Sequence, residues 1–252
     1  MNNFFKPGLS WKNEDIDKLI NKYSFFKEYT TLGYITNNLV YKYDHLLQIM
    51  PKEYNTIWSD VGVVLDESTD HYSNQKLIDS AFEFIKKNDG DSIGNTIKLI
   101  RSLHIIKSTN KDNDVSFSDP KLPFSVFISI PTLDSKHYIE RLVENIIHES
   151  LHLQLTLIEK HETLYNVNQH KIYSPWKNEP RNNVGIMHAV YVFSKLKHFW
   201  DKVRVSNSID FSSSRVKAID MELKKIEKSK IEDFYSEKGN SLLSSCLIPA
   251  LQ

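Results

Sequence analysis

The 252-residue sequence contains one cysteine, Cys246. A single cysteine cannot form an internal disulfide, and it excludes the cysteine-rich sites that hold structural zinc or iron–sulfur clusters. Such sparing use of cysteine suits a reducing compartment. The first residues also lack the basic start and apolar run of a secretory signal. We therefore expect a cytoplasmic protein.

Glycine is also scarce. Seven glycines are present, and none lies in a G-x-G-x-x-G or G-x-x-x-x-G-K-[ST] pattern. Those patterns supply the backbone amides that bind phosphates in dinucleotide sites and P-loops. The sequence therefore excludes both of these nucleotide-binding classes.

A net charge and long apolar runs are missing as well. The 32 Lys and Arg residues balance the 32 Asp and Glu residues, so the chain lacks the excess positive charge of a general nucleic-acid binder. No apolar run approaches the roughly 20 residues that span a bilayer. We expect neither a nucleic-acid nor a membrane partner, and the sequence does not fix the oligomeric state.

Hydrophobic residues make up 40% of the chain, enough for a substantial core. Their spacing predicts helices over 14–27, 75–86, 93–106, 184–203 and 213–230, and one over 135–157 with Ser135 as its N-cap. Strands are expected over 124–130 and 61–65, and loops over 108–122 and 163–183. The pattern predicts a mainly α protein with a small β component, in one helical domain over 1–252. Its helical region 1–130 is a candidate for peptide recognition, and 131–252 carries the candidate metal site.

The pattern H-E-x-x-H occurs at His148-Glu149-Ser150-Leu151-His152, inside the most strongly periodic helix. Two histidines four residues apart lie on one helix face, where both rings can bind one ion at about 2.0–2.1 Å. Glu149 projects about 100° away from His148. It is therefore a candidate catalytic residue that acts on a metal-bound water or orients a ligand. The competing interpretation is two histidines and a glutamate on a partly exposed helix face.

Spacing alone does not identify a third ligand. The position of the third histidine of a metzincin is occupied by Ile158. Glu159 and Glu162 come too early for a thermolysin-like glutamate, and Glu179 comes somewhat late. His188 lies one turn into an otherwise apolar helix, where a buried ring needs a partner, either a metal or a hydrogen bond within the core. The other histidines considered are expected at the surface: His161, His170 and His198.

The segment before His188 combines rigid and charged residues. It contains Ser174-Pro175-Trp176 and Pro180-Arg181, with Arg181 seven residues before His188. An arginine can hold a carboxylate through two parallel hydrogen bonds. The competing interpretation is that Trp176 fills the core and Arg181 is a surface charge.

The order H-E-x-x-H, Ser-Pro-Trp, Pro-Arg and Val-Gly-Ile-Met-His-Ala-Val-Tyr-Val-Phe resembles the 2-oxoglutarate-dependent HExxH peptide β-hydroxylases of ribosomal-peptide modification clusters. The resemblance covers about residues 140–201 and extends weakly to 237–243, which is similar to the family's closing helix. Residues 1–130 match only as a helical region of about the expected size. The chain departs from the family at Asn182 and Ala189, where a proline and a glycine are frequent.

The resemblance implies an iron(II) oxygenase that uses 2-oxoglutarate and O₂ to hydroxylate the β-carbon of an acidic, amide or imidazole side chain in a ribosomally made precursor peptide. Glu149 would then orient a ligand or the substrate. The implied metal ligands are three histidines: His148, His152 and His188. The implied 2-oxoglutarate site consists of Arg181 at the distal carboxylate, with Trp176 and Ser174.

Two other functions fit the same residues. A zinc metallopeptidase would use Glu149 as the general base, with His188 or Glu179 as the third ligand. A helical module that binds peptides without catalysis would need no metal. Because histidines accept both iron and zinc, the ligands alone do not separate the peptidase from the hydroxylase.

Overall fold

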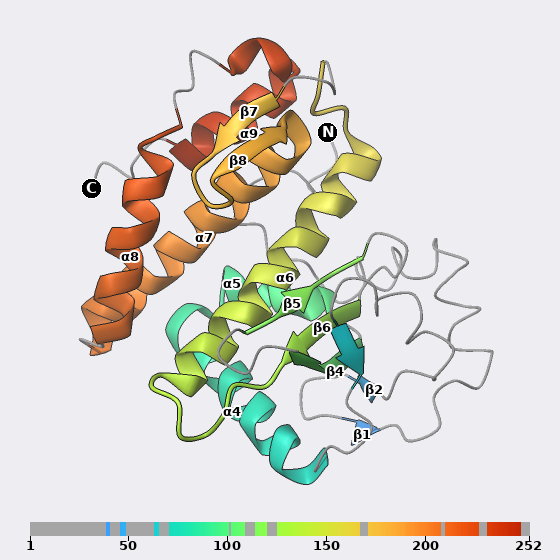
Figure 1. Ribbon diagram of the computed structural model, residues 1–252, viewed down its shortest axis with the longest axis vertical. Coiled ribbons are helices and arrows are strands. Elements are labelled where there is room, and N and C mark those ends of the chain that lie inside the picture. The colour runs from blue at the N-terminus through green and yellow to red at the C-terminus, as the bar shows by residue number, and fades with distance from the viewer. Residues whose placement is uncertain are drawn as a thin grey trace, which may run out of the picture. The chain divides into compact units, whose positions relative to one another are not determined.

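The computed structural model describes residues 39–40, 46–48, 63–65, 71–100, 102–108, 114–119, 125–166, 171–207, 210–226 and 231–247. This part of the chain is mainly helical with two small sheets, which confirms the expected fold class (Figure 1). The helix expected over 14–27 lies outside the described residues. Among the helices that are described, none combines the length and the apolar character needed to cross a membrane.

The chain divides into two compact units, and the division falls inside α6 (Tyr138–His161). We call Ser10–Leu153 the sheet unit. Gln154–Gln252 together with Met1–Leu9 form the helical unit. The expectation of one domain over the whole chain stays a prediction.

The sheet unit is built on a six-stranded mixed sheet with the order β1-β2-β4-β6-β5, in which β3 also pairs with β4. The central strand β4 runs parallel to β2 and β6, and the other pairs are antiparallel. The strands are β1 (Leu39–Val40), β2 (Leu46–Gln48), β3 (Val63–Leu65), β4 (Ser102–Ser108), β5 (Ser116–Phe117) and β6 (Ser125–Ser129). The strands predicted over 61–65 and 124–130 are thereby confirmed with shorter bounds.

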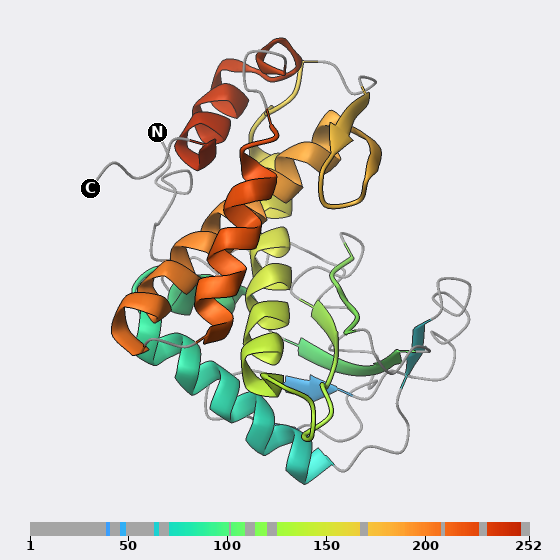
Figure 2. The same cartoon turned by 60° about the vertical axis from the view of Figure 1, so that its left-hand side comes forward.

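The helices of the sheet unit bury apolar faces. They are α4 (His71–Asp89), α5 (Ile93–Thr96) with the 3-10 turn η4 (Ile97–Leu99), and the first part of α6. Figure 2 shows the sheet to one side of α4 and of the first part of α6. The core of α4 repeats at helical spacing, with Ile78, Ala81, Phe82 and Ile85 almost fully buried. This repeat confirms the helix predicted over 75–86.

Two predictions about helices and loops in the sheet unit were wrong. The expected helix over 93–106 ends at Leu99, and its second half is the strand β4. Leu103, His104, Ile105 and Ile106 are all buried, and the exposed Lys107 comes only near the end of the strand, so β4 has no polar alternation to distinguish it from a buried helix. The expected loop over 108–122 contains β5, which is too short to give a periodic signal.

The helical unit is organised around α7 (Asn183–Asn207). Figure 2 shows α7 side by side with α8 (Asp210–Leu223), and α9 (Glu237–Leu247) also packs on α7. The 3-10 turn η6 (Glu232–Phe234) precedes α9. Large side chains of α7 are fully buried, among them Tyr191, Phe199 and Trp200. The helices predicted over 184–203 and 213–230 are confirmed, although α8 ends at Leu223.

The expected loop over 163–183 instead contains a hairpin of β7 (Lys171–Ser174) and β8 (Glu179–Asn182). Apart from Ser174, its residues are exposed or half-buried, so the sequence carries no buried alternation there. The predicted N-cap was also wrong. The helix α6 begins at Tyr138, and the Ser135 hydroxyl donates to the carbonyl of Thr132 at 2.6 Å.

Candidate metal centre

One face of α6 is polar and half-buried, whereas most of its other residues are buried. We call this face the polar stripe. At about 100° per residue, its members fall within an arc of about 80°. They are Asn145, His148, His152, Thr156 and Glu159. The helix therefore keeps its histidines at the edge of the core, where they can reach a ligand.

The rings of His148 and His152 converge. Their Nε2 atoms lie 3.1 Å apart and their centroids 4.7 Å apart. Two nitrogens bound to one ion at about 2.1 Å, at angles of about 90–110°, lie about 3.0–3.4 Å apart. The two nitrogens are also within hydrogen-bonding distance of each other, and the same separation fits two positions on one divalent metal ion.

Glu149 points away from the pair into the sheet unit. Its side chain is almost fully buried, with 3% of the residue exposed, and Ser116 of β5 donates a hydrogen bond to its Oε1 at 2.8 Å. Burial raises the pKa of Glu149 to about 7, and hydrogen bonds from Ser116 and Ser118 limit the rise. Arg141 binds Asp114 through two hydrogen bonds of 2.6 and 2.8 Å, which fixes the same segment on α6.

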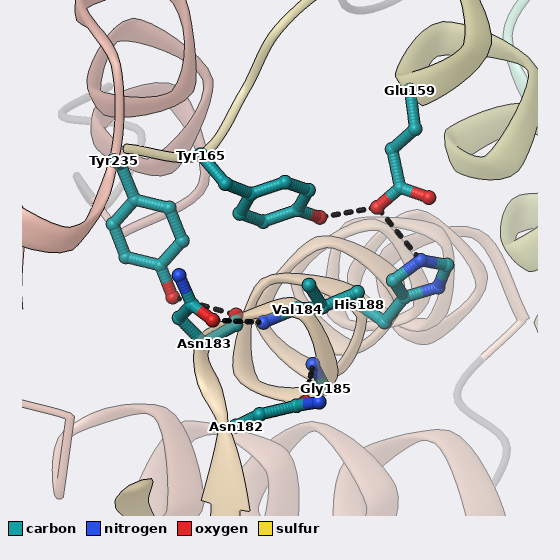
Figure 3. A network of polar contacts seen from close by, with 8 residues as sticks. All are labelled: Glu159, Tyr165, Asn182, Asn183, Val184, Gly185, His188 and Tyr235. Carbon is teal, nitrogen blue, oxygen red and sulfur yellow. Dashed lines mark hydrogen bonds and ion pairs between the residues drawn. The ribbon is translucent and has the colours of Figure 1, made fainter. Parts of the chain in front are cut away.

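His188 lies on the second turn of α7 and is half-buried. Its Nε2 atom is 2.9 Å from Oε1 of Glu159, and the hydroxyl of Tyr165 donates to the same oxygen. Figure 3 shows Tyr165 and His188 approaching this carboxylate from two sides. The expected partner of a core histidine is therefore present, and it is a carboxylate from the polar stripe.

Arg181 lies at the start of α7. The helix is capped by Asn182, whose side-chain oxygen accepts the amide of Gly185 at 2.8 Å (Figure 3). A methyl group on Gly185 would lie 3.3 Å from Nε of Arg181, so the guanidinium side chain rests on the first turn of α7. It also pairs with Glu179 at 3.3 Å, at a half-exposed position. Arg181 thus lies in β8, two residues before α7 begins, and His188 lies on the second turn of that helix.

Ser174 is the last residue of β7, and Trp176 lies in the turn of the hairpin. The Trp176 ring stacks on Phe193 with centroids 5.0 Å apart and planes 5° apart. Its indole nitrogen is buried and has no hydrogen-bond acceptor among the described residues. Ser174 is buried, with 2% of its surface exposed. Their roles in binding 2-oxoglutarate stay predictions.

The printed contacts join these side chains in separate pairs, His148 with His152, His188 with Glu159, and Arg181 with Glu179. Within the described residues, no three His, Cys, Asp or Glu side chains form a group that could hold a metal ion. The assignment of His188 as third ligand stays a prediction. His198 is exposed as expected, whereas His170 lies outside the described residues.

Sequence reasoning considered Glu159 only as a metal ligand and missed its contact with His188, and it missed Ser116 as the partner of Glu149. Glu159 follows His152 by seven residues, which returns it to the same helix face, and this spacing was the available signal. Ser116 lies in a segment expected to be a loop, far from Glu149 in sequence, and no local pattern links the two residues.

Comparisons with protein-family models and with curated proteins found no match to this chain. The resemblance to the HExxH peptide β-hydroxylases therefore depends only on the residues given above.

Proposed function

We propose that the chain is an iron(II)- and 2-oxoglutarate-dependent oxygenase that hydroxylates a peptide side chain at its β-carbon. The observation that carries the metal part is the 3.1 Å separation of the His148 and His152 Nε2 atoms. His188 would complete three facial ligands and leave positions for the co-substrate and O₂. Three histidines carry no negative charge, so a bidentate 2-oxoacid would supply the anionic donors.

Arg181 supports a 2-oxoacid as that co-substrate. Its guanidinium lies against the first turn of α7, one turn before His188, and already pairs with a carboxylate oxygen of Glu179. A dicarboxylate could replace Glu179 there, because a guanidinium can bind a carboxylate through two parallel hydrogen bonds. The Trp176 indole N–H, buried without an acceptor among the described residues, is a further donor for this site.

In the proposed reaction, 2-oxoglutarate loses CO₂ and is oxidised to succinate, while a β C–H bond becomes C–OH. One atom of O₂ enters succinate and the other enters the product. Bound iron would supply the oxidising chemistry. The chain's own residues bind and orient: Arg181 holds the co-substrate, and Glu149 keeps α6 fixed on Ser116.

The substrate in this proposal is a ribosomally made precursor peptide with an acidic, amide or imidazole side chain at the reacting position. We propose a cytoplasmic site of action, because the single cysteine suits a reducing compartment. Such a compartment would also keep the iron in its ferrous state.

The first test measures 2-oxoglutarate binding to anaerobic, Fe(II)-loaded protein by the visible absorption of the chelate. We expect Arg181→Ala to weaken binding about 100-fold, because it removes a charge-assisted pair of hydrogen bonds worth a few kcal/mol. The matched control is Arg204→Ala, since Arg204 is also on the surface of the helical unit and also pairs with a carboxylate, that of Asp201. If both variants bind 2-oxoglutarate with equal affinity, Arg181 is not part of the binding site.

The second test measures product. Peptides that contain Asp, Asn or His are incubated with Fe(II), O₂ and 2-oxoglutarate and analysed by mass spectrometry. We expect the gain of one oxygen atom, lost in His188→Ala and Arg181→Ala. The gain of oxygen without added 2-oxoglutarate would refute the co-substrate.

One observation favours a zinc metallopeptidase as the second candidate. A general base works best when its pKa lies near the working pH, and burial raises the pKa of Glu149 to about 7. Against this, its carboxylate accepts a hydrogen bond from Ser116 and is almost fully buried. Peptide cleavage by zinc-loaded protein, abolished by Glu149→Gln, would establish the peptidase.

A further inference from the structure

The hairpin of β7 and β8 leaves one edge of β7 open. The two strands form a sheet of their own, and within the described residues no third strand pairs with β7 (Figure 1). An open edge presents backbone N–H and C=O groups that can pair with another strand. Several classes of protein bind extended peptides at such an edge.

The register of the hairpin shows which backbone groups face the open edge. Pro180 of β8 pairs with Tyr173, although a proline has no N–H to give to the ladder. This pair must therefore be one of the non-hydrogen-bonded pairs, which alternate with hydrogen-bonded pairs in an antiparallel ladder. The N–H and C=O of Tyr173 then point to the open edge. Those of Lys171, two residues earlier on the same strand, point the same way.

The side chains along this edge are aromatic and positively charged. Lys171 and Tyr173 lie on the outer face of β7, where Tyr173 is 53% exposed. Lys177 follows in the turn and is also exposed. Neither lysine forms an ion pair with another residue in the described part of the chain. The acidic residue of the hairpin, Glu179, already pairs with Arg181, so the two lysine charges are not neutralised.

The hairpin is held in place by α7. Ser174 is buried, and the Trp176 ring in the turn stacks on Phe193 with centroids 5.0 Å apart. The amide of Asn178 donates to the carbonyl of Ser174 at 2.9 Å, and Asn182 caps α7. An isolated two-stranded hairpin is only marginally stable in water, so these anchors keep β7 extended. A strand that is already ordered loses little conformational entropy when it binds a partner.

We propose that the open edge of β7 binds an acidic peptide in an extended conformation, which adds to the hairpin as a third strand. The N–H and C=O groups of Lys171 and Tyr173 pair with the peptide backbone, and Lys171 and Lys177 pair with its carboxylates. A second copy of this chain is a poorer occupant, because two β7 strands would bring like charges together. The identity of this peptide as the substrate rests on the proposed function, whereas the binding itself requires no metal.

The first experiment tests the charge. Fluorescence anisotropy of metal-free, full-length protein measures the affinity of a labelled peptide of about eight residues that alternates Glu and Val. We expect Lys171→Glu to weaken binding about 3- to 10-fold. The control is Lys217→Glu on α8, an exposed lysine that likewise has no ion pair with a described residue, and it should bind like the wild type. Equal losses in both variants, or equal affinity for a peptide with Lys in place of Glu, would contradict the inference.

The second experiment tests the backbone pairing. Tyr173→Pro and Tyr173→Ala both remove the ring, but only the proline removes the N–H at the open edge, which the ladder with β8 does not use. We expect the proline variant to bind the Glu–Val peptide about 10-fold more weakly than the alanine variant. A Glu–Val peptide with N-methyl groups at alternate residues should also lose affinity for the wild type. If neither change weakens binding, the peptide does not add as a strand.

Amide hydrogen exchange locates the bound peptide. We expect it to slow exchange at Lys171 and Tyr173, and to change Ile172 little, because the Ile172 amide already bonds to Arg181 in the ladder. Protection on another surface, or protection of the same amides in a peptide-free dimer, would overturn the inference. So would failure of the wild type to bind the peptide, and the proposed oxygenase would be unaffected. Binding without any hydroxylation would instead refute only the proposed function.

Discussion

Glu149 belongs to the H-E-x-x-H motif, and its carboxyl group is almost fully buried. It belongs to H-E-x-x-H, yet it lies inside the sheet unit, where Ser116 is its hydrogen-bond donor at 2.8 Å. Loss of hydration raises the pKa of Glu149 to about 7 from an ordinary value of 4.5. The neutral acid is therefore the form that the fold favours.

This shift predicts a pH-dependent stability. Below pH 4.5 the carboxyl group is protonated in both the folded and the unfolded state. It then makes no pH-dependent contribution to the free energy of unfolding. Between pH 4.5 and 7 the folded state holds the proton more tightly, so the free energy of unfolding falls as pH rises. Above pH 7 the cost is complete, at about 3 kcal/mol.

Glu149→Gln removes this ionisation and keeps an oxygen that can accept from Ser116. We expect metal-free Glu149→Gln to be more stable than the wild type at pH 8, by up to about 3 kcal/mol, and similar to it near pH 4.5. Urea denaturation at both pH values measures the difference. A stability difference that stays constant with pH would show that ionisation of Glu149 is not its cause.

The helices that carry the candidate site could be predicted because each has one continuous buried face. In α6, Leu142, Ile146 and Leu153 recur at helical spacing, and the polar stripe fills the remaining arc. The strand β4 could not be predicted, because it is buried on both faces and gives the same apolar run as a buried helix. The hairpin of β7 and β8 could not be predicted either, because its strands are mostly exposed and carry no apolar pattern.

Gly239 gives a prediction about how α9 docks. A methyl group at this position would lie far inside van der Waals contact with the backbone carbonyl of Leu164, and backbone cannot move aside cheaply. Helix propensity alone favours alanine over glycine by about 0.5–1 kcal/mol. Because the clash involves backbone, we expect Gly239→Ala to destabilise the protein by about 1–3 kcal/mol.

Chemical denaturation measures this effect. The control is Ser241→Ala, an exposed position on the same helix, which we expect to change stability by less than about 0.5 kcal/mol. A Gly239→Ala protein as stable as the control would mean that α9 does not pack closely on Leu164.

For the whole molecule, the sequence predicted the fold class and the histidine pair, because both depend on spacing within one element. The contacts of His188 with Glu159 and of Glu149 with Ser116 join elements separated by 29 and 33 residues. Such pairs depend on how helices and strands pack, and no local pattern encodes them. The third metal ligand could not be identified from spacing for the same reason, because it would come from a different helix.

Metal binding tests that third ligand directly. The proposed ligands are His148 and His152 on α6 and His188 on α7. Saturation with redox-inert Zn(II), at 100 times its dissociation constant, should stabilise the protein by about 2.7 kcal/mol. We therefore expect Zn(II) to slow amide hydrogen exchange both in the middle of α6 and in the first turns of α7.

In His188→Ala the protection of α7 should disappear while that of α6 remains in part, because two histidines still bind the ion weakly. His198→Ala is the control, since it removes an exposed histidine from the same helix. Protection confined to α6 in the wild type would exclude His188 as a ligand, because a bound nitrogen ties its own helix turn to the ion. The metal would then have only the histidine pair of α6, and the hydroxylase proposal would lose its facial triad.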